Sequence, residues 1–182
     1  MSQPSRVLIL PGWLNSGPAH WQSRWETLHS FERVDQANWL WPRRGDWMAR
    51  LDDVLLADPR PAFLAAHSLG CLLVAAWAGH SQHTSLVHGA LLVAPPDVER
   101  DDLAPQLRPW RPIPRQPLPF AASVVYSDDD PYCSSSRALG MAASWGARVC
   151  SVGAAGHVNG DSGLGHWPAG VAWLRELGAT VP

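Results

Sequence analysis

Short apolar runs recur along the chain, and segments with helical spacing of apolar residues separate most of them. Each run stops at a proline, a glycine or a polar turn. Strands that are apolar throughout are typical of a parallel sheet buried on both faces, because a sheet with one wet face alternates apolar and polar positions. The pattern predicts strands at residues 7–10, 33–37, 62–66, 89–94, 121–126 and 147–152, the second being the most exposed.

Helices are expected where apolar residues recur at intervals of three and four. Pro18 suits the first turn of the earliest helix, and Asp46 suits the N-cap of the next. The predicted helices cover residues 18–29, 46–56, 69–78, 134–145 and 169–177. Strands that alternate with helices indicate an α/β fold of three layers, a mostly parallel sheet with helices on both faces, in one domain over residues 1–182.

Residues 95–120 form the one long segment without regular periodicity. A long helix is excluded there, because proline lacks a backbone N–H and prolines stand at positions 95, 96, 105, 109, 112, 114, 117 and 119. We expect this segment to cross the surface, with one short helical turn near residues 101–103. It is too rich in proline to form the paired helices of a lid domain.

One polar residue, Ser68, stands between a predicted strand and a predicted helix. Small residues lie two positions before and after it, at Ala66 and Gly70. This is the pattern of a nucleophile elbow, in which a strained serine at a sharp turn holds its hydroxyl clear of the sheet. The usual first glycine is replaced by Ala66. A strand–helix loop that merely contains a serine is the alternative, so the possible partners of Ser68 decide between the two.

A serine hydroxyl becomes nucleophilic when a histidine takes its proton, and a carboxylate fixes the tautomer of that histidine. In the elbow arrangement these groups follow in the chain order serine, acid, histidine. Asp128, Asp129 and Asp130 follow the strand at 121–126, and His157 follows the strand at 147–152. Each feature alone also occurs in ordinary solvated loops. Three matches in the right order favour a catalytic site.

Acyl transfer also needs N–H donors for the oxyanion that forms on the substrate carbonyl. The backbone N–H of Leu69 is one candidate, because Leu69 follows the serine at the start of a helix. The backbone N–H of Trp13, in the loop after the first strand, is the other. A simple Pro-Gly turn is the alternative for that loop. His67 is expected to point to the other side of the elbow and to support it.

The composition narrows the range of functions. The formal net charge is −2 and the basic residues, all arginine, are scattered, so no basic stripe for nucleic acid is present. No apolar window approaches a membrane span or a signal peptide, so no membrane contact and a cytoplasmic location are expected. Cys71, Cys133 and Cys150 are odd in number and widely spaced, which predicts free thiols and neither disulfides nor a metal site.

Four motifs in order resemble the small serine-hydrolase family related to retinoblastoma-binding protein 9. They are Leu10-Pro11-Gly12-Trp13 with His20-Trp21, Ala66-His67-Ser68-Leu69-Gly70, Asp129-Asp130-Pro131-Tyr132 and Gly156-His157-Val158-Asn159. The resemblance implies an α/β-hydrolase fold without a separate lid domain, with Ser68 as nucleophile and His157 as base. The family's aspartate directly precedes a proline, which selects Asp130. Ser162-Gly163 and Trp167-Pro168 resemble the bacterial branch.

We therefore predict a carboxylesterase-like serine hydrolase that cleaves small esters or related acyl compounds through an acyl-enzyme, without metal or other cofactor. Eleven tryptophans suggest aromatic surface as well as core. With Trp13, the residues His20, Trp21 and Trp167 are expected to form an aromatic rim around Ser68 that favours short acyl groups. The rival hypothesis is a protein- or peptide-binding module that uses exposed tryptophan or the proline-rich segment. An acyltransferase or perhydrolase on the same elbow also stays open.

Overall fold

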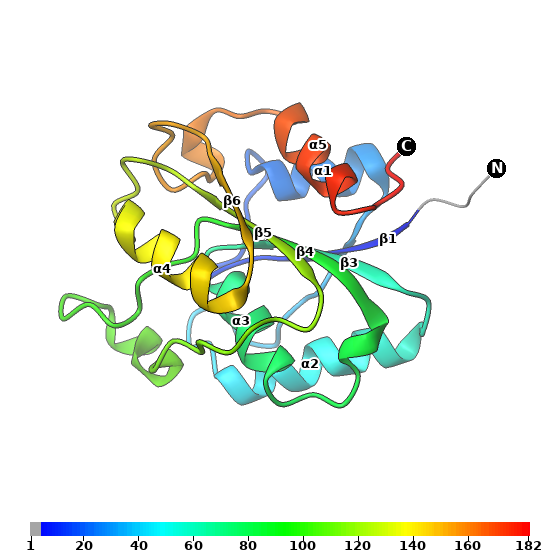
Figure 1. Ribbon diagram of the computed structural model, residues 1–182, viewed down its shortest axis with the longest axis horizontal. Helices are drawn as coiled ribbons and strands as arrows, with labels where there is room; N and C mark the ends of the chain where they lie inside the picture. Colours follow the sequence, from blue (N-terminus) through cyan, green and yellow to red (C-terminus); the bar gives the residue numbers. More distant parts are fainter. Residues whose placement is uncertain (1–4) are drawn as a thin grey trace.

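A six-stranded parallel sheet forms the centre of the protein (Figure 1). The computed structural model describes residues 5–182, and within them the strand order is β2-β1-β3-β4-β5-β6, with every neighbouring pair parallel. The strands are β1 Arg6–Leu10, β2 Glu32–Arg33, β3 Ala62–His67, β4 Val87–Val93, β5 Ala121–Tyr126 and β6 Arg148–Ser151. The predicted parallel sheet is confirmed. Only β2, at the edge of the sheet, is much shorter than expected.

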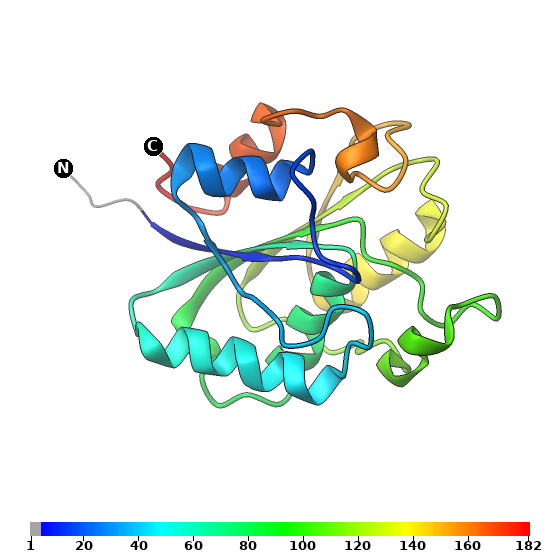
Figure 2. The same cartoon turned by 180° about the vertical axis from the view of Figure 1, so that it is seen from behind.

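Helices cover both faces of the sheet, which confirms the three-layer α/β architecture. The α-helices are α1 Trp21–His29, α2 Arg44–Ala57, α3 Leu69–Ala78, α4 Ser135–Trp145 and α5 Pro168–Glu176. Short 3₁₀ helices are η1 Thr84–Leu86, η2 Pro105–Trp110 and η3 Gly160–Ser162. Helices α1 and α5 pack on one face of the sheet and α2, α3 and α4 on the other (Figures 1 and 2). None of the helices within residues 5–182 combines the length and the apolar character that a membrane crossing requires.

The pleat of the strands divides the buried residues between the two helical layers. In β1, Leu8 and Leu10 face the layer of α2, α3 and α4, whereas Val7 and Ile9 face α1 and α5. All four are at most 2% exposed. Successive side chains of a strand point to opposite faces, so a strand buried on both sides must be apolar at every position. This is why the short continuous apolar runs predicted the strands well.

Most of the tryptophans belong to the core and not to a surface patch. Seven of the eleven are buried, namely Trp21, Trp25, Trp47, Trp77, Trp110, Trp145 and Trp167. A buried indole N–H needs an acceptor, and several of these rings donate to loop carbonyls. Trp110 donates to Pro42 at 2.9 Å, and Trp145 donates to Pro114 at 2.7 Å. The rings therefore fill the layers and also fasten loops to them.

Two predicted helix starts and one predicted turn are wrong. Helix α1 begins at Trp21, so Pro18 is not in its first turn, because the His20 side chain caps it by accepting from the backbone N–H of Gln22. Helix α2 begins at Arg44, which leaves Asp46 inside its first turn and not at the N-cap. The helical turn of the proline-rich segment is η2 and not residues 101–103; Pro105 starts it.

The start of α3 presses directly on the end of β1, and Gly70 makes this approach possible. A Cβ at position 70 would overlap the carbonyl oxygen of Leu10 and would lie 3.0 Å from that of Pro11. Backbone atoms cannot yield as a flexible side chain can. A glycine two residues after the serine is therefore a packing requirement of the turn.

We expect Gly70→Ala to destabilise the protein by on the order of 3 kcal/mol, because the added methyl group overpacks a backbone contact. Gly140→Ala in α4 is the matched control: nothing lies within 4 Å of its added Cβ. Alanine there should stabilise the protein by roughly 0.5–1 kcal/mol through helix propensity. Urea unfolding of both variants measures the contrast. Equal stabilities would contradict the close approach of α3 to β1.

Candidate active site

Ser68 sits in the sharp turn between β3 and α3 with a backbone conformation that is rare for serine. Its φ and ψ are 53° and −123°. The neighbouring strand holds the turn, since the backbone N–H of Ser68 donates to the carbonyl of Val93 at 2.9 Å. A strained φ of this kind costs free energy and persists only where the surroundings fix it. The backbone therefore has the conformation expected of a nucleophile elbow.

Three side chains from three loops meet at the carboxyl edge of the sheet. The Nε2 atom of His157 lies 2.8 Å from the Oγ atom of Ser68. On the other side of the ring, Nδ1 lies 3.0 and 2.9 Å from the two carboxylate oxygens of Asp130. A carboxylate can only accept, so Nδ1 carries a proton and Nε2 is free to accept from the serine hydroxyl. The Asp130 side chain is 3% exposed, so water competes little for this bond.

The three consecutive aspartates differ in their hydrogen bonds and in their exposure. Asp130 contacts His157, as described above. The Oδ1 atom of Asp129 accepts from the backbone N–H of Gly156 at 2.7 Å and from the hydroxyl of Ser127 at 2.8 Å. The Gly156 N–H, more than any other group, lowers the pKa of Asp129 below its usual value. Asp128 is exposed, and within residues 5–182 only its backbone N–H makes a hydrogen bond, to the carbonyl of Gly153. Asp129 thus fastens the loop on which His157 stands.

The two backbone N–H groups suggested for an oxyanion lie beside the serine. No acceptor within residues 5–182 takes the backbone N–H of Trp13 or of Leu69. Gly12 brings the two loops together: a Cβ on it would be 2.7 Å from the Cβ of Ser68 and 3.2 Å from the nitrogen of Leu69. The indole of Trp13 donates to the carbonyl of Leu40 at 2.9 Å, which anchors the loop. Both N–H groups are available to an added ligand.

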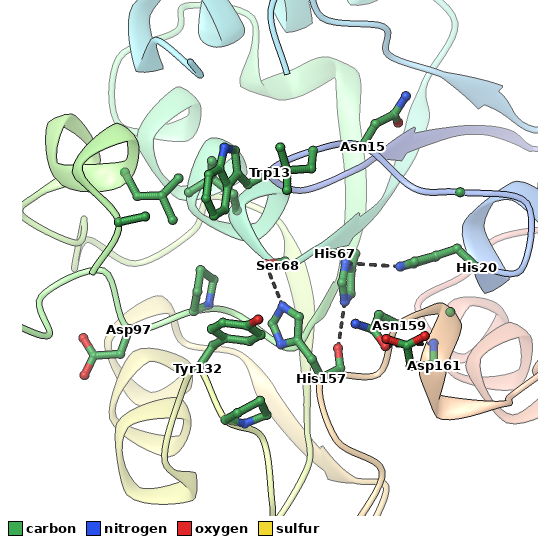
Figure 3. A pocket seen from close by; sticks show the side chains of 18 of the residues that line it. Trp13, Asn15, His20, His67, Ser68, Asp97, Tyr132, His157, Asn159 and Asp161 are labelled. Carbon is green, nitrogen blue, oxygen red and sulfur yellow. Dashed lines mark hydrogen bonds between the residues drawn. The ribbon is translucent and has the colours of Figure 1, made fainter. Parts of the chain in front are cut away.

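A cavity of about 650 Å³ opens over Ser68. Trp13, Asp97 and Tyr132 lie to one side of the Ser68–His157 pair, and Asn15, His20, Asn159 and Asp161 lie to the other (Figure 3). The proline-rich segment adds apolar side chains to the lining, namely Pro96, Leu103, Ala104 and Leu107. The volume and the mixture of apolar walls with a few polar groups are typical of sites for small molecules.

The predicted aromatic rim is wrong for two of its members. His20 and Trp13 line the cavity, but Trp21 and Trp167 do not. Their rings pack against each other between α1 and α5, with centroids 5.0 Å apart, and are only 1% and 5% exposed. Both face the sheet because helix α1 and the loop before α5 turn that side inward. The aromatic side chains of Trp21 and Trp167 suggested a rim around Ser68, but both are buried in the core and do not line the cavity.

Tyr132 and the leucines of segment 95–120 are lining residues that sequence reasoning missed. The Tyr132 ring stands edge-on to His157 at a centroid distance of 4.6 Å, and Tyr132 is 54% exposed. Its place directly after the Asp-Pro pair was the available signal. Leu103 and Leu107 gave no such signal, since no periodicity marks the segment that carries them.

Cys71 and Cys133 are unsuited to act as nucleophiles near Ser68, and the described residues form no metal cluster there. Cys71 is fully buried below the elbow, and burial raises the pKa of its thiol well above the usual value, so it stays protonated. Burial likewise raises the pKa of Cys133 to about 12. Across the described part of the chain, residues 5–182, no three His, Cys, Asp or Glu side chains gather as metal ligands would.

Comparisons with known proteins concern the family and the fold. A family model described as serine hydrolase matches residues 7–176. Among solved structures, a YdeN-like hydrolase from Pectobacterium atrosepticum is 29% identical with a TM-score of 0.84, and the match covers 96% of this chain and 91% of that one. No curated protein sequence matches.

Two further solved structures share the fold at lower identity. The ydeN gene product of Bacillus subtilis is 22% identical with a TM-score of 0.72, over 95% of this chain and 98% of that one. Carboxylesterase CesB of Bacillus subtilis is 16% identical with a TM-score of 0.61, over 97% of this chain and 84% of that one. Likeness at these identities supports the common architecture alone.

Proposed function

The chain belongs to the serine hydrolase family, and on that basis we propose that Ser68, His157 and Asp130 form a catalytic triad that hydrolyses small esters or related acyl compounds. The family and the fold, that of the α/β hydrolases, make the protein a hydrolase. One observation carries the finer proposal: a serine in an elbow conformation lies 2.8 Å from a histidine whose other nitrogen meets a buried carboxylate.

The reaction proceeds in two steps. The Ser68 hydroxyl oxygen bonds to the substrate carbonyl carbon while His157 Nε2 takes the hydroxyl proton, and the carbonyl π electrons move to the oxygen. The backbone N–H groups of Trp13 and Leu69 donate to that oxyanion. Collapse of the intermediate breaks the bond to the leaving alcohol, which receives the proton from His157. Water then repeats the sequence on the acyl-enzyme and releases the acid. Asp130 stabilises the imidazolium in both steps.

The size and walls of the cavity favour compact substrates. The apolar part of the lining, which includes Trp13, Leu103 and Leu107, suits a short acyl chain or a small aromatic group. Two comparisons are compatible with this choice: a solved neighbour is a carboxylesterase, and the four sequence motifs resemble the small serine hydrolases related to retinoblastoma-binding protein 9. Our proposal therefore includes a relationship to that narrower group of small serine hydrolases.

A protein-binding module with an idle triad is the second candidate, and the burial pattern weakens it. Such a module would use exposed tryptophan, but most of the rings are in the core. Trp41, 55% exposed, is the main exception. Acyl transfer to an acceptor other than water needs the same triad, so the geometry serves an acyltransferase or perhydrolase equally well.

We expect a fluorophosphonate probe to form one adduct, at Ser68, because only an activated serine reacts. Mass spectrometry of the labelled protein locates the adduct. Labelling should vanish in Ser68→Ala and persist in Cys71→Ala, since the Cys71 thiol is buried and protonated. A wild type that does not label would favour the binding module, and labelling that survives in Ser68→Ala would place the nucleophile elsewhere.

Asp130→Asn should lower kcat for p-nitrophenyl acetate by on the order of 10⁴, because an amide favours the wrong tautomer of His157. Asp129→Asn and Asp128→Asn are matched controls in the same turn. An asparagine at 129 still accepts from Gly156 through its amide oxygen, and Asp128 faces water, so each should change kcat by less than about threefold. Comparable losses at all three positions would show that the run acts as a unit and not through Asp130.

Rates on p-nitrophenyl esters should be highest from acetate to butyrate and fall steeply by octanoate. Leu103→Ala removes part of the apolar wall and should move the optimum to longer chains. Trp167→Ala should leave the optimum unchanged and lower stability by about 3–5 kcal/mol, because Trp167 is core. A wild type that prefers laurate would mean a deep acyl channel, contrary to this proposal.

A further inference from the structure

Two buried histidines lie beside the proposed catalytic base and play no part in the triad. His67 is the last residue of β3, and His20 caps α1; each is only 5% exposed. Their rings are 4.6 Å apart, and the ring of His67 is 4.9 Å from that of His157. Figure 3 shows the pair on the far side of His157 from Tyr132. Buried imidazole rings this close together need hydrogen-bond partners for their nitrogen atoms.

The pair forms a continuous chain of hydrogen bonds that ends on the backbone of His157. The backbone N–H of Gln22 donates to His20 Nδ1 at 3.1 Å. His20 Nε2 lies 3.3 Å from His67 Nδ1. His67 Nε2 lies 2.8 Å from the carbonyl oxygen of His157. Within residues 5–182, this last bond and the one from Ser68 to His157 are the only hydrogen bonds that join β3 or Ser68 to the loop of His157.

The two ends of the chain fix the proton on every nitrogen between them. A carbonyl only accepts, so His67 Nε2 carries a proton. A backbone N–H only donates, so His20 Nδ1 is bare. With both rings neutral, His20 Nε2–H then points at the bare Nδ1 of His67, and every site is satisfied. A second proton on either ring would bring two N–H groups face to face.

The surroundings also hold both rings uncharged. Burial, followed by the charges of Arg33 and His157, lowers the pKa of His20 to about 3. Burial, followed by His20 and His157, lowers the pKa of His67 well below its usual value, although the bond to the His157 carbonyl opposes this. Arg33 of β2 and, when it is protonated, His157 are the charges that lower these pKa values, and the carboxylate of Asp161 lines the same side of the cavity (Figure 3). No ion pair within residues 5–182 joins a carboxylate to either ring.

The chain of bonds is anchored in the sheet through Gln22, which is fully buried. Its side-chain amide donates to the carbonyls of Leu10 at 3.1 Å, at the end of β1, and of Ala65 at 3.0 Å, within β3. Its amide oxygen accepts from the hydroxyl of Ser16 at 2.7 Å. Gln22 therefore fixes His20, and through it His67, relative to β1 and β3, the two strands that also position Ser68.

We propose that His67, backed by His20, is a positioning residue for the hydrolytic reaction: its Nε2–H holds the backbone carbonyl of His157, which sets the imidazole against Ser68, and the pair stays neutral while His157 takes the proton. This inference rests on the proposed function. A charged ring 4.9 Å from His157 would oppose the imidazolium that forms in the reaction. A neutral donor supplies the same bond without that repulsion.

Two variants of similar volume separate positioning from folding. His67→Gln keeps an amide N–H for the His157 carbonyl and an amide oxygen for His20. His67→Leu keeps neither. We expect His67→Leu to lower kcat for p-nitrophenyl acetate by on the order of 10–100-fold with KM changed less than about twofold, because a small displacement of the base slows chemistry more than binding. His67→Gln should restore kcat to within about threefold of wild type.

The kcat values are referred to the reactive serines counted by fluorophosphonate titration, so an unfolded fraction does not lower them. Equal kcat in wild type and His67→Leu, or an equal loss in both variants, would overturn the inference while leaving the hydrolase proposal intact. A wild type that neither labels nor turns over esters would overturn the proposed function and this inference with it.

A measurement on the unmodified protein covers the case in which His67→Leu does not fold. In ¹⁵N spectra of histidine-labelled wild type, the signals that disappear in His20→Gln and in His67→Gln should show neutral rings with the proton on Nε2 from pH 5 to 8. The acid side of the kcat/KM profile should then fall with the slope of a single proton. A proton on Nδ1 of His67, or titration of either ring in that range, would overturn the positioning role.

Discussion

The close approach of α3 to the end of β1 is the constraint on which the site depends. Position 70 has no room for a Cβ against the carbonyls of Leu10 and Pro11, and position 12 has none against Ser68. Two glycines, one on each side of the contact, therefore allow the turn to close. Closure forces Ser68 into its strained conformation and brings the free N–H groups of the β1 loop and of the α3 start to the same place. The positions of the proposed nucleophile and of the proposed oxyanion donors therefore follow from one packing contact.

The pleat of β3 gives the neighbours His67 and Ser68 different surroundings. Phe63 and Ala65 face the layer of α1 and α5, and Leu64 and Ala66 face the other layer. His67 continues the first series and meets His20 at the start of α1. Ser68 would continue the second, but the chain turns there and leaves its hydroxyl at the edge of the sheet. In the sheet order, β2 and β4 lie on opposite sides of the β1–β3 pair, so beyond the contact between Gly12 and Ser68 the chain leaves β1 and β3 in opposite directions. A crevice at such a point is typical of open parallel sheets.

Some of these features could be predicted from the sequence, and others could not. Apolar runs predicted the strands because burial on both faces requires them, and the order of Ser68, the aspartates and His157 predicted which loops would meet. The choice of Asp130 came from family resemblance and not from the pattern, since Asp129 has the same chemistry and differs only in where the turn points it. Trp21 and Trp167 were placed at the site wrongly, because ring type does not reveal which face of a helix is inward. The histidine chain could not be predicted: its partners are contributed by Gln22, β3 and the loop of His157, far apart in sequence.

The proline-rich segment shows how a cavity wall can be fixed without a lid of paired helices. Trp110 within it donates to Pro42, and Trp145 of α4 donates to Pro114, so buried indoles hold the segment from two sides. Arg137 of α4 pairs with Asp97 and with Glu99 near its beginning, and Glu99 in turn accepts from the backbone N–H of Ile113. The two indole bonds contribute about 1 kcal/mol each. The ion pairs of Arg137 are partly exposed and contribute less. Together these bonds oppose opening of the segment as a unit. Leu103 and Leu107 therefore belong to a fixed wall of the cavity. In the proposed reaction, the selection of acyl groups depends on these side chains more than on a closing motion.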